Sequence, residues 1–441
     1  MIEVRPEIAG AIVCVRAQWN PHVMFARRPS GQQGRRVQGS AAVRWLFLIT
    51  VSVLGLASIA RADDALLPRG DEGWYEAGHA GIRGATIGPI ESSLFPGRGY
   101  GTPSTEALLD HLARRGVTWV SVTPFGRIWS LQSTDILMDF EAPYEDNRAA
   151  VSRLVEQAHA RGMQVLLIPH LWVETEGWRG RIDPGSEAGW AAYRASYRAF
   201  VTAWARDAAA AGADAFSIGV ECGSWSGRFG RYWRELITEI RDIFPGLLTY
   251  SANWDEVGDV LFWDQLDLIG INAFYPLADH DGASFREYVQ GASRARQTLA
   301  EIVAVVDKPV LFVEVGYTTR ENAAVQPWLW PDGMDEVRIS EREQARALLA
   351  SFRAFLPQRW FVGFFVWRWY ADLDDVSQEA IWGFSPHGKR AERLLERVFA
   401  QPWAVDRGPY SWLEEPAPPG PSVFDVVSDI ELRTRSTVVP R

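Results

Sequence analysis

Two glutamates each end an apolar stretch that has the composition of a buried strand. Glu221 ends the stretch Phe216-Ser-Ile-Gly-Val-Glu, and Glu314 ends the stretch Lys308-Pro-Val-Leu-Phe-Val-Glu. Small turn residues follow both of them within two positions. Cleavage of a glycosidic bond needs two carboxyl groups, one as a proton donor and one as a nucleophile or base. We therefore take Glu221 and Glu314 as a candidate catalytic pair, the alternative being that each is only a salt-bridge partner.

The elements that must position this pair alternate between strand and helix from about residue 80 to residue 402. Apolar runs predict strands near 82–88, 117–123, 164–170, 216–221, 247–253, 266–272, 308–314 and 361–367. Helical periodicity follows them, starting near residue 104 and then over 147–161, 186–211, 231–243, 284–306, 341–355 and 389–399. Eight such units indicate an α/β fold, a single (β/α)₈ barrel, with Glu221 on the fourth strand and Glu314 on the seventh. A doubly wound open sheet is disfavoured because polar or aromatic residues follow nearly every strand, as at one shared rim.

The residues that follow the other strands are candidates for binding a sugar. They are His170, Trp172, Asn253, Trp254, Asn272, Tyr275, Trp367, Trp369 and Trp382. A Trp side chain offers a flat apolar face for a sugar ring, although each Trp is about as readily explained as core filling. We expect Trp367 to form the floor of the cleaved sugar's subsite and Tyr275 to donate its hydroxyl to Glu314. Arg127 and Arg368 are more typical of surface ion pairs than of a site for a charged or branched substrate.

Composition excludes several classes of function. The chain has 441 residues, of which 47% are hydrophobic and 23% charged, and this balance is typical of a folded globular protein. Residues 1–62 carry eight Arg and two Glu, so residues 63–441 carry a net charge of −16 when the whole chain carries −10. An acidic protein is a poor partner for nucleic acid or anionic membranes. Cys14 and Cys222 form no cysteine metal site, and His170 has no second ligand at metal spacing, so we expect no metal and no cofactor.

The first 62 residues have the pattern of a targeting segment. Arginines precede the apolar run 45–60, which ends in the small-residue motif Ala60-Arg-Ala62. The run is shorter than the roughly 20 residues that span a bilayer comfortably, so we expect cleavage and export to the periplasm or the outside, with an uncleaved N-terminal anchor as the alternative. The barrel domain is then 63–402, and 403–441 is a Pro-rich linker and C-terminal tail.

Several segments together resemble clan A of the glycoside hydrolases, most closely family 113, which is known for β-1,4-mannanases. They are Ser217-Ile-Gly-Val-Glu-Cys222, Ser251-Ala-Asn-Trp-Asp-Glu256, Phe262-Trp-Asp-Gln-Leu-Asp-Leu-Ile-Gly-Ile-Asn-Ala-Phe-Tyr-Pro-Leu277, Lys308-Pro-Val-Leu-Phe-Val-Glu-Val-Gly-Tyr317 and Trp382-Gly-Phe-Ser-Pro-His-Gly-Lys389. The resemblance covers most of residues 80–400. It implies a retaining double displacement on a β-linked, mannan-like polysaccharide, with Glu221 as acid/base and Glu314 as nucleophile. Burial beside the Glu314 charge is then expected to keep Glu221 protonated in the resting site.

Two positions depart from the family pattern. Val220 stands where clan A commonly has Asn and family 113 a small polar residue, and Asn272 stands where the family tends to have Asp. Val cannot bond a sugar hydroxyl or hold the acid/base. Three readings therefore stay open beside the mannanase: the same machinery on another β-glycan such as a glucan or an exopolysaccharide, a carbohydrate-binding pseudoenzyme, and a scaffold that acts through the tail. In each case we expect a monomer whose partner is a polysaccharide or oligosaccharide.

Overall fold

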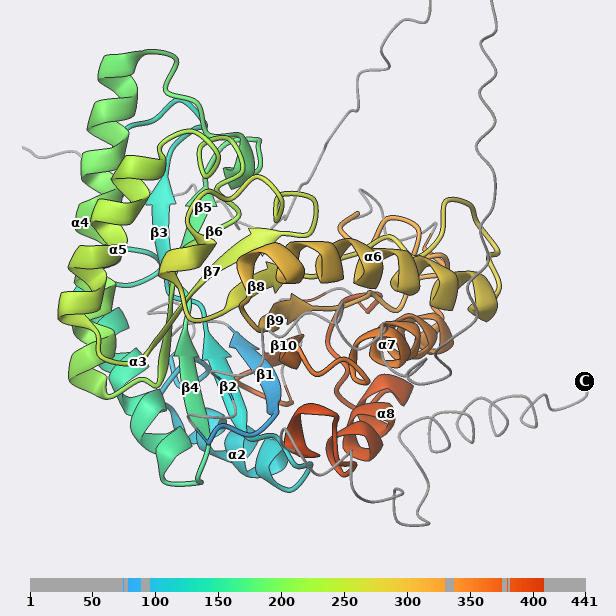
Figure 1. The fold of residues 1–441 in the computed structure, drawn as a ribbon. Helices are drawn as coiled ribbons and strands as arrows, with labels where there is room; N and C mark the ends of the chain where they lie inside the picture. The colour runs from blue at the N-terminus through green and yellow to red at the C-terminus, as the bar shows by residue number, and fades with distance from the viewer. Residues whose placement is uncertain are drawn as a thin grey trace, which may run out of the picture. The chain divides into compact units, whose positions relative to one another are not determined.

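Eight parallel strands close into a barrel in the computed structural model, which describes residues 74, 78–88, 96–329, 337–374, 379 and 381–407 (Figure 1). The strands are β1 (Ile82–Gly88), β2 (Trp119–Val122), β4 (Gln164–Leu167), β6 (Ala215–Val220), β7 (Leu247–Asn253), β8 (Ile269–Asn272), β9 (Val310–Val315) and β10 (Phe361–Tyr370). Each pairs with the next strand around the barrel, and β1 pairs with β10 to close it. The predicted (β/α)₈ fold is confirmed.

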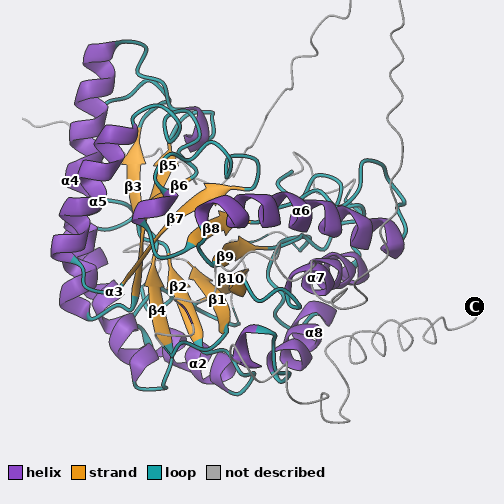
Figure 2. Cartoon of the chain, viewed as in Figure 1, coloured by secondary structure: helices purple, strands orange, loops and turns teal. Residues whose placement is uncertain are grey.

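The helices surround the barrel, as Figure 2 shows. They are α2 (Pro103–Ala113), α3 (Tyr144–His159), α4 (Glu187–Ala211), α5 (Gly230–Ile243), α6 (Phe285–Val306), α7 (Glu341–Phe355) and α8 (Arg390–Phe399). Side-chain caps fix several of their starts: Ser186, Ser284 and Ser340 each accept a hydrogen bond from the backbone N–H three residues on. These starts agree with the sequence prediction because capping is a local signal that needs no tertiary contact.

A second, two-stranded sheet stands beyond the barrel and was not predicted. It consists of β3 (Phe125–Ile128) and β5 (His170–Val173), paired in parallel with Phe125 opposite His170 (Figure 1). The sequence analysis predicted no strand over 125–128 and took His170 as the end of the third barrel strand. Pro169 explains the break, since it lacks the N–H that a continuous ladder needs. Because β3 and β5 are stabilised mainly by each other, neither four-residue stretch signals a strand alone.

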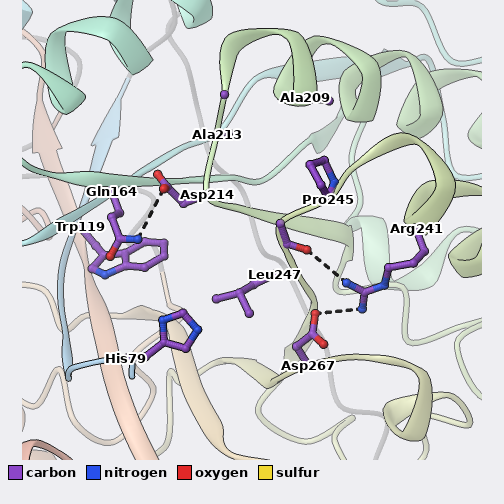
Figure 3. Close-up of a pocket in the computed structure, with 12 residues that line it drawn as sticks. His79, Trp119, Gln164, Ala209, Ala213, Asp214, Arg241, Pro245, Leu247 and Asp267 are labelled. Atoms are coloured by element: carbon purple, nitrogen blue, oxygen red, sulfur yellow. Dashed lines mark hydrogen bonds and ion pairs between the residues drawn. The ribbon is translucent and has the colours of Figure 1, made fainter. Parts of the chain in front are cut away.

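A hollow of about 590 Å³ lies at the end of the barrel where the strands begin (Figure 3). It is lined by residues at the starts of β2, β4 and β7 and by the turns that precede strands. Its polar groups already pair with one another: Arg241 lies 2.9 Å from Asp267, and Gln164 donates to Asp214 at 3.4 Å. The catalytic face of this fold is the opposite rim, so we assign this hollow a structural role.

The described chain continues to pack on the barrel after α8. Trp403 is buried and stacks on Phe364 with ring centroids 5.2 Å apart, and Asp406 pairs with Arg83 at 2.6 Å. The predicted leader 1–62, and the part of the predicted tail after residue 407, lie outside the described residues. Among the helices that the structure describes, none is long and apolar enough to cross a membrane.

Candidate active site

Glu221 occupies a tight turn at the carboxyl end of β6. Its φ is +50°, a left-handed conformation that few residues other than glycine adopt, and such strained positions often lie at functional sites. Backbone bonds on both sides hold the turn, since the Glu221 N–H donates to the Ser251 carbonyl at 2.8 Å and the Cys222 N–H donates to the Tyr250 hydroxyl at 2.7 Å. The side chain is only 6% exposed. The fold thus fixes the direction of this carboxylate before any ligand binds.

Three donors surround the Glu221 carboxylate. Trp178 Nε1 and Arg179 Nη1 donate to Oε2 at 2.7 and 2.9 Å, and Asn272 Nδ2 donates to Oε1 at 3.0 Å. Arg179 is buried as well, so the pair is a charged contact largely removed from water. Donors in this number, one of them cationic, suit an ionised acceptor. Val220 therefore does not leave Glu221 without support, because side chains from other elements hold it.

Glu314 faces a neutral histidine. It lies on β9, is 4% exposed, and its Oε1 lies 3.2 Å from His170 Nε2 without hydrogen-bond alignment. Burial, with the nearby Arg179 and Arg368 charges, keeps the pKa of His170 well below 6.5. Arg179 Nη2 lies 3.3 Å from His170 Nδ1, and a guanidinium can only donate. The ring proton of His170 therefore sits on Nε2, on the side of Glu314.

In the free protein, Glu314 carries a proton at neutral pH. Burial, followed by the Glu221 charge, raises the pKa of Glu314 to about 8, although Arg179, Arg368 and Asn272 oppose the shift. The sequence analysis expected Glu221 to hold this proton in the resting site. The strongest donors, Trp178 and Arg179, lie against Glu221, and Glu314 has only weak ones. The fold decides which loop side chains contact each carboxylate.

Glu314→Gln is expected to stabilise the protein at alkaline pH. Since the folded pKa of Glu314 lies above that of a free Glu, ionising this buried group costs stability as pH rises from about 4.5 to about 8. We expect the substitution to raise the free energy of unfolding by up to about 5 kcal/mol at pH 9 and by much less at pH 5, measured by urea titration. Glu221→Gln is the matched control and should destabilise the protein, because it leaves Arg179 buried without its carboxylate. Equal stability of Glu314→Gln and wild type at pH 9 would contradict the proton placement.

A third buried carboxyl group supports the turn at Glu221. Glu256 is 5% exposed and accepts hydrogen bonds from the Tyr250 hydroxyl and from the Asn253 N–H at 3.1 Å. Burial raises its pKa to about 7. Because Tyr250 also receives the Cys222 N–H, Glu256 is linked through one side chain to the residue after Glu221.

The sequence analysis missed three residues of this network: Trp178, Arg179 and Glu256. Glu256 was noted only as part of the segment after the fifth strand. Trp178 and Arg179 lie in and beside a short 3₁₀ helix, Arg179–Arg181, within a long connection between β5 and α4. Periodicity cannot place such residues. The adjacent Trp and Arg in a connection on the carboxyl side of a strand are the only local signal.

Several predicted sugar-binding residues do lie around the pair. Trp367 is stacked near His170, with ring centroids 6.1 Å apart and an interplanar angle of 8°. Asn272 donates to Glu221, and Trp172 is partly exposed beside His170 on β5. Trp254, on the rim after β7, stacks on Trp328 at 5.5 Å, and Asn253 donates to Asp255 at 2.6 Å. These side chains give the rim both ring faces and polar groups.

Among the described residues, three other predicted rim side chains have no contact with Glu221 or Glu314 in this structure. The Tyr275 hydroxyl does not bond Glu314 and has no hydrogen-bond partner among the described residues; its ring lies near Trp254, Phe312 and Phe355. Trp369 is buried, donates to Glu392 at 3.4 Å and therefore faces α8. Trp382 is also fully buried, at 1% exposure.

The position of Trp369 has a physical cause in the strand register. Between the pairs Ala85–Val366 and Ile87–Trp369, β10 has one residue more than β1. An extra residue breaks the alternation of side chains along a strand, so Trp367 and Trp369 cannot be assigned to one face by counting in twos. No sequence pattern marks this irregularity.

One cluster of described residues has metal-ligand types, but it lies elsewhere. Ligand atoms of His111, His387 and Glu392 lie within 4.8 Å of one another. Glu392 Oε1 is already 2.6 Å from His111 Nε2 and 3.3 Å from Arg115 Nε, and Oε2 accepts the Gly388 N–H at 2.9 Å. An adjacent guanidinium disfavours a bound cation, so we interpret the cluster as a structural contact between α2 and α8.

Comparison with known proteins agrees with this geometry. The model of Glycoside Hydrolase Family 113 matches residues 95–389, a span that holds both carboxyl groups and the loops around them. The chain belongs to Glycoside Hydrolase Family 113. It is thus a glycoside hydrolase of the mannanase-like kind, as the resemblance in its motifs predicted. No curated protein matches the chain.

Solved structures of family 113 are similar over the whole barrel. A family 113 β-mannanase from Alicyclobacillus acidocaldarius is 26% identical, with a TM-score of 0.63, and the alignment covers 73% of this chain and 98% of that one. A further family 113 β-1,4-mannanase is 26% identical, with a TM-score of 0.62 and coverage of 73% and 99%. A family 5 mannosidase from Rhizomucor miehei, at 11% identity and a TM-score of 0.50, shares the fold.

Proposed function

We propose that this family 113 member is a retaining β-glycosidase that hydrolyses a β-linked, mannan-like polysaccharide by double displacement. The observation that supports it most is the buried pair Glu221 and Glu314, whose charges interact at the end of the barrel. Asn272 lies opposite Glu314 in the strand register and donates to Glu221, so one side chain couples the two. The solved relatives named above as β-mannanases support the choice of substrate.

In the first step, Glu221 gives a proton to the leaving oxygen as Glu314 attacks the anomeric carbon. Glu314 attacks only as a carboxylate, so the proton that it holds in the free protein must pass to Glu221 when substrate binds. Donors that the free site lacks favour this transfer. His170 Nε2–H lies 3.2 Å from Glu314 without alignment, and sugar hydroxyls add further donors that lower the pKa of Glu314.

In the second step, a water molecule attacks the glycosyl–enzyme ester. Glu221, now a carboxylate, takes the proton of that water, and the bond between the anomeric carbon and Glu314 breaks with net retention. The donors Trp178, Arg179 and Asn272 stabilise Glu221 in this charged state and orient it. The reaction returns the pair to its one-proton form.

Activity of residues 63–441 on a panel of β-linked polysaccharides tests this proposal. The panel comprises mannan, glucomannan, cellulosic and laminarin-type glucans and xylan, with products separated by chromatography. We expect short mannooligosaccharides, and a release at least about 10³-fold slower from Glu314→Gln. Cleavage of a different polysaccharide would keep the mechanism and replace the substrate. Binding without cleavage would favour the pseudoenzyme that Val220 raised.

We also propose that residues 1–62 direct export and that the mature protein acts as a monomer outside the cytoplasm. The basic residues, the apolar run 45–60 and the Ala60-Arg-Ala62 motif support export. The N-terminal sequence of protein recovered from a producing cell distinguishes cleavage after Ala62 from an uncleaved anchor.

A further inference from the structure

One face of the sheet of β3 and β5 packs on α4, and the other leads away from the catalytic pair, with Phe140 packed on Phe125 and lying beside Trp172 and Arg127. On the packed face, a Cβ at Gly126 would come within 2.7 Å of Phe200 on α4, and Ile128 and Leu171 are buried. Side chains two residues apart share a face of a strand. The other face therefore carries Phe125 and Arg127 from β3 and His170 and Trp172 from β5, and Trp129 and Glu174 directly follow the two strands.

This second face begins at the catalytic centre. His170 lies 3.2 Å from Glu314, and Phe125 is opposite His170 in the register. The pairing continues past the strand ends, since the Thr175 N–H donates to the Trp129 carbonyl at 3.0 Å. At ~3.3 Å a residue, the row of Trp129 and Glu174 lies roughly 13 Å along the strands from the row of His170. That is farther than one sugar ring extends.

Exposure along this face increases with distance from Glu314. His170 is buried, Trp172 is partly exposed, and Trp129 is 70% exposed. Between the two Trp residues, Arg127 and Glu174 form an ion pair at 2.6 Å whose side chains reach solvent. A flat ring, a hydrogen-bonding pair and a second flat ring follow one another outward. This sequence of groups suits a neutral glycan chain, which offers apolar ring faces and hydroxyls in alternation.

We propose that Trp129, with the Arg127–Glu174 pair, forms a distal sugar-binding subsite for a neutral β-glycan chain whose reacting sugar lies at Glu314. The inference rests on the proposed function, because it takes the ligand to be a β-linked chain. A lone exposed Trp needs no ligand to explain it. Trp129 differs in that it directly follows β3, whose partner strand β5 carries Trp172 and the His170 that lies next to Glu314.

The test measures by calorimetry how binding affinity depends on the length of the glycan chain. The probes are mannohexaose and mannobiose, and every variant is made in the Glu314→Gln background to prevent turnover. Trp129→Ala is expected to lower the ratio of hexaose to biose affinity about three- to tenfold, the loss of one ring stacking contact. Val305→Ala is the matched control, since Val305 is an 85% exposed apolar residue on α6, and the ratio should not change.

The outcomes separate this subsite from the proposed function. An unchanged ratio in Trp129→Ala, or a hexaose that binds no more tightly than the biose, overturns the subsite even if mannan is hydrolysed. A hexaose-to-biose affinity ratio that falls as expected, while the polysaccharide panel shows no hydrolysis, would support the subsite and contradict the proposed hydrolytic activity. The circular dichroism spectrum of Trp129→Ala confirms folding, and Trp129→Phe, which keeps a ring, should restore part of the ratio.

Discussion

Sodium azide is expected to restore turnover to both Glu314→Ala and Glu221→Ala, with opposite product stereochemistry. In Glu314→Ala the nucleophile is gone, so azide attacks from its side of the sugar and gives an α-glycosyl azide from a β-linked substrate. In Glu221→Ala the glycosyl–Glu314 ester still forms from an activated aryl glycoside. Azide then releases it as the β-glycosyl azide. Without azide, each variant should lose at least about 10³-fold in kcat.

This experiment assigns the roles that proton placement alone leaves undecided. Glu314 holds the proton in the free protein because burial and the Glu221 charge raise its pKa to about 8. A carboxyl group that stayed protonated throughout would be the acid, and Glu221 would be the nucleophile. Product anomers measured by NMR distinguish the cases, since exchanged stereochemistry in the two variants would reverse our assignment. Glu145→Ala, at an exposed pair with Arg148, is the matched control and should keep wild-type turnover.

Arg179→Ala is expected to cost both stability and activity. Arg179 is the charged partner of Glu221 and also contacts His170 Nδ1, and both contacts are buried. Removing one partner of a buried ion pair costs about 3–5 kcal/mol, because the remaining charge is left unpaired. Urea unfolding at pH 7 measures this loss. Turnover should fall as well, since Glu221 loses the donor that orients it.

Two further variants sharpen this result. Arg231→Ala removes an exposed ion pair with Glu235 and should change the free energy of unfolding by less than about 0.5 kcal/mol. Arg179→Lys keeps the charge but loses the fork that reaches Glu221 and His170 together, so we expect stability to recover more than activity does. A wild-type free energy of unfolding in Arg179→Ala would show that the pair contributes nothing to the fold.

The amino-acid sequence by itself determined the barrel and the two strand-end carboxyl groups. Apolar strands, amphipathic helices and Ser caps are local signals, so the order of elements and most boundaries could be predicted from them. The positions of Glu221 and Glu314 followed, because parallel strands in a barrel deliver their last residues to one rim. His170, Asn272 and Trp367 were predicted for the same reason and do lie beside Glu221 and Glu314 or the residues that contact them.

Only the tertiary structure decided which side chains contact one another at that rim. Tyr275 and Trp369 follow strands too, yet local register and packing turn them elsewhere. Trp178 and Arg179 reach Glu221 from a connection more than forty residues away in sequence, and burial beside the Glu221 charge raises the pKa of Glu314. The sheet of β3 and β5 exists through pairing between segments that carry no strand signal alone. Such contacts join residues distant in sequence, and periodicity, which reads neighbours along the chain, cannot report them.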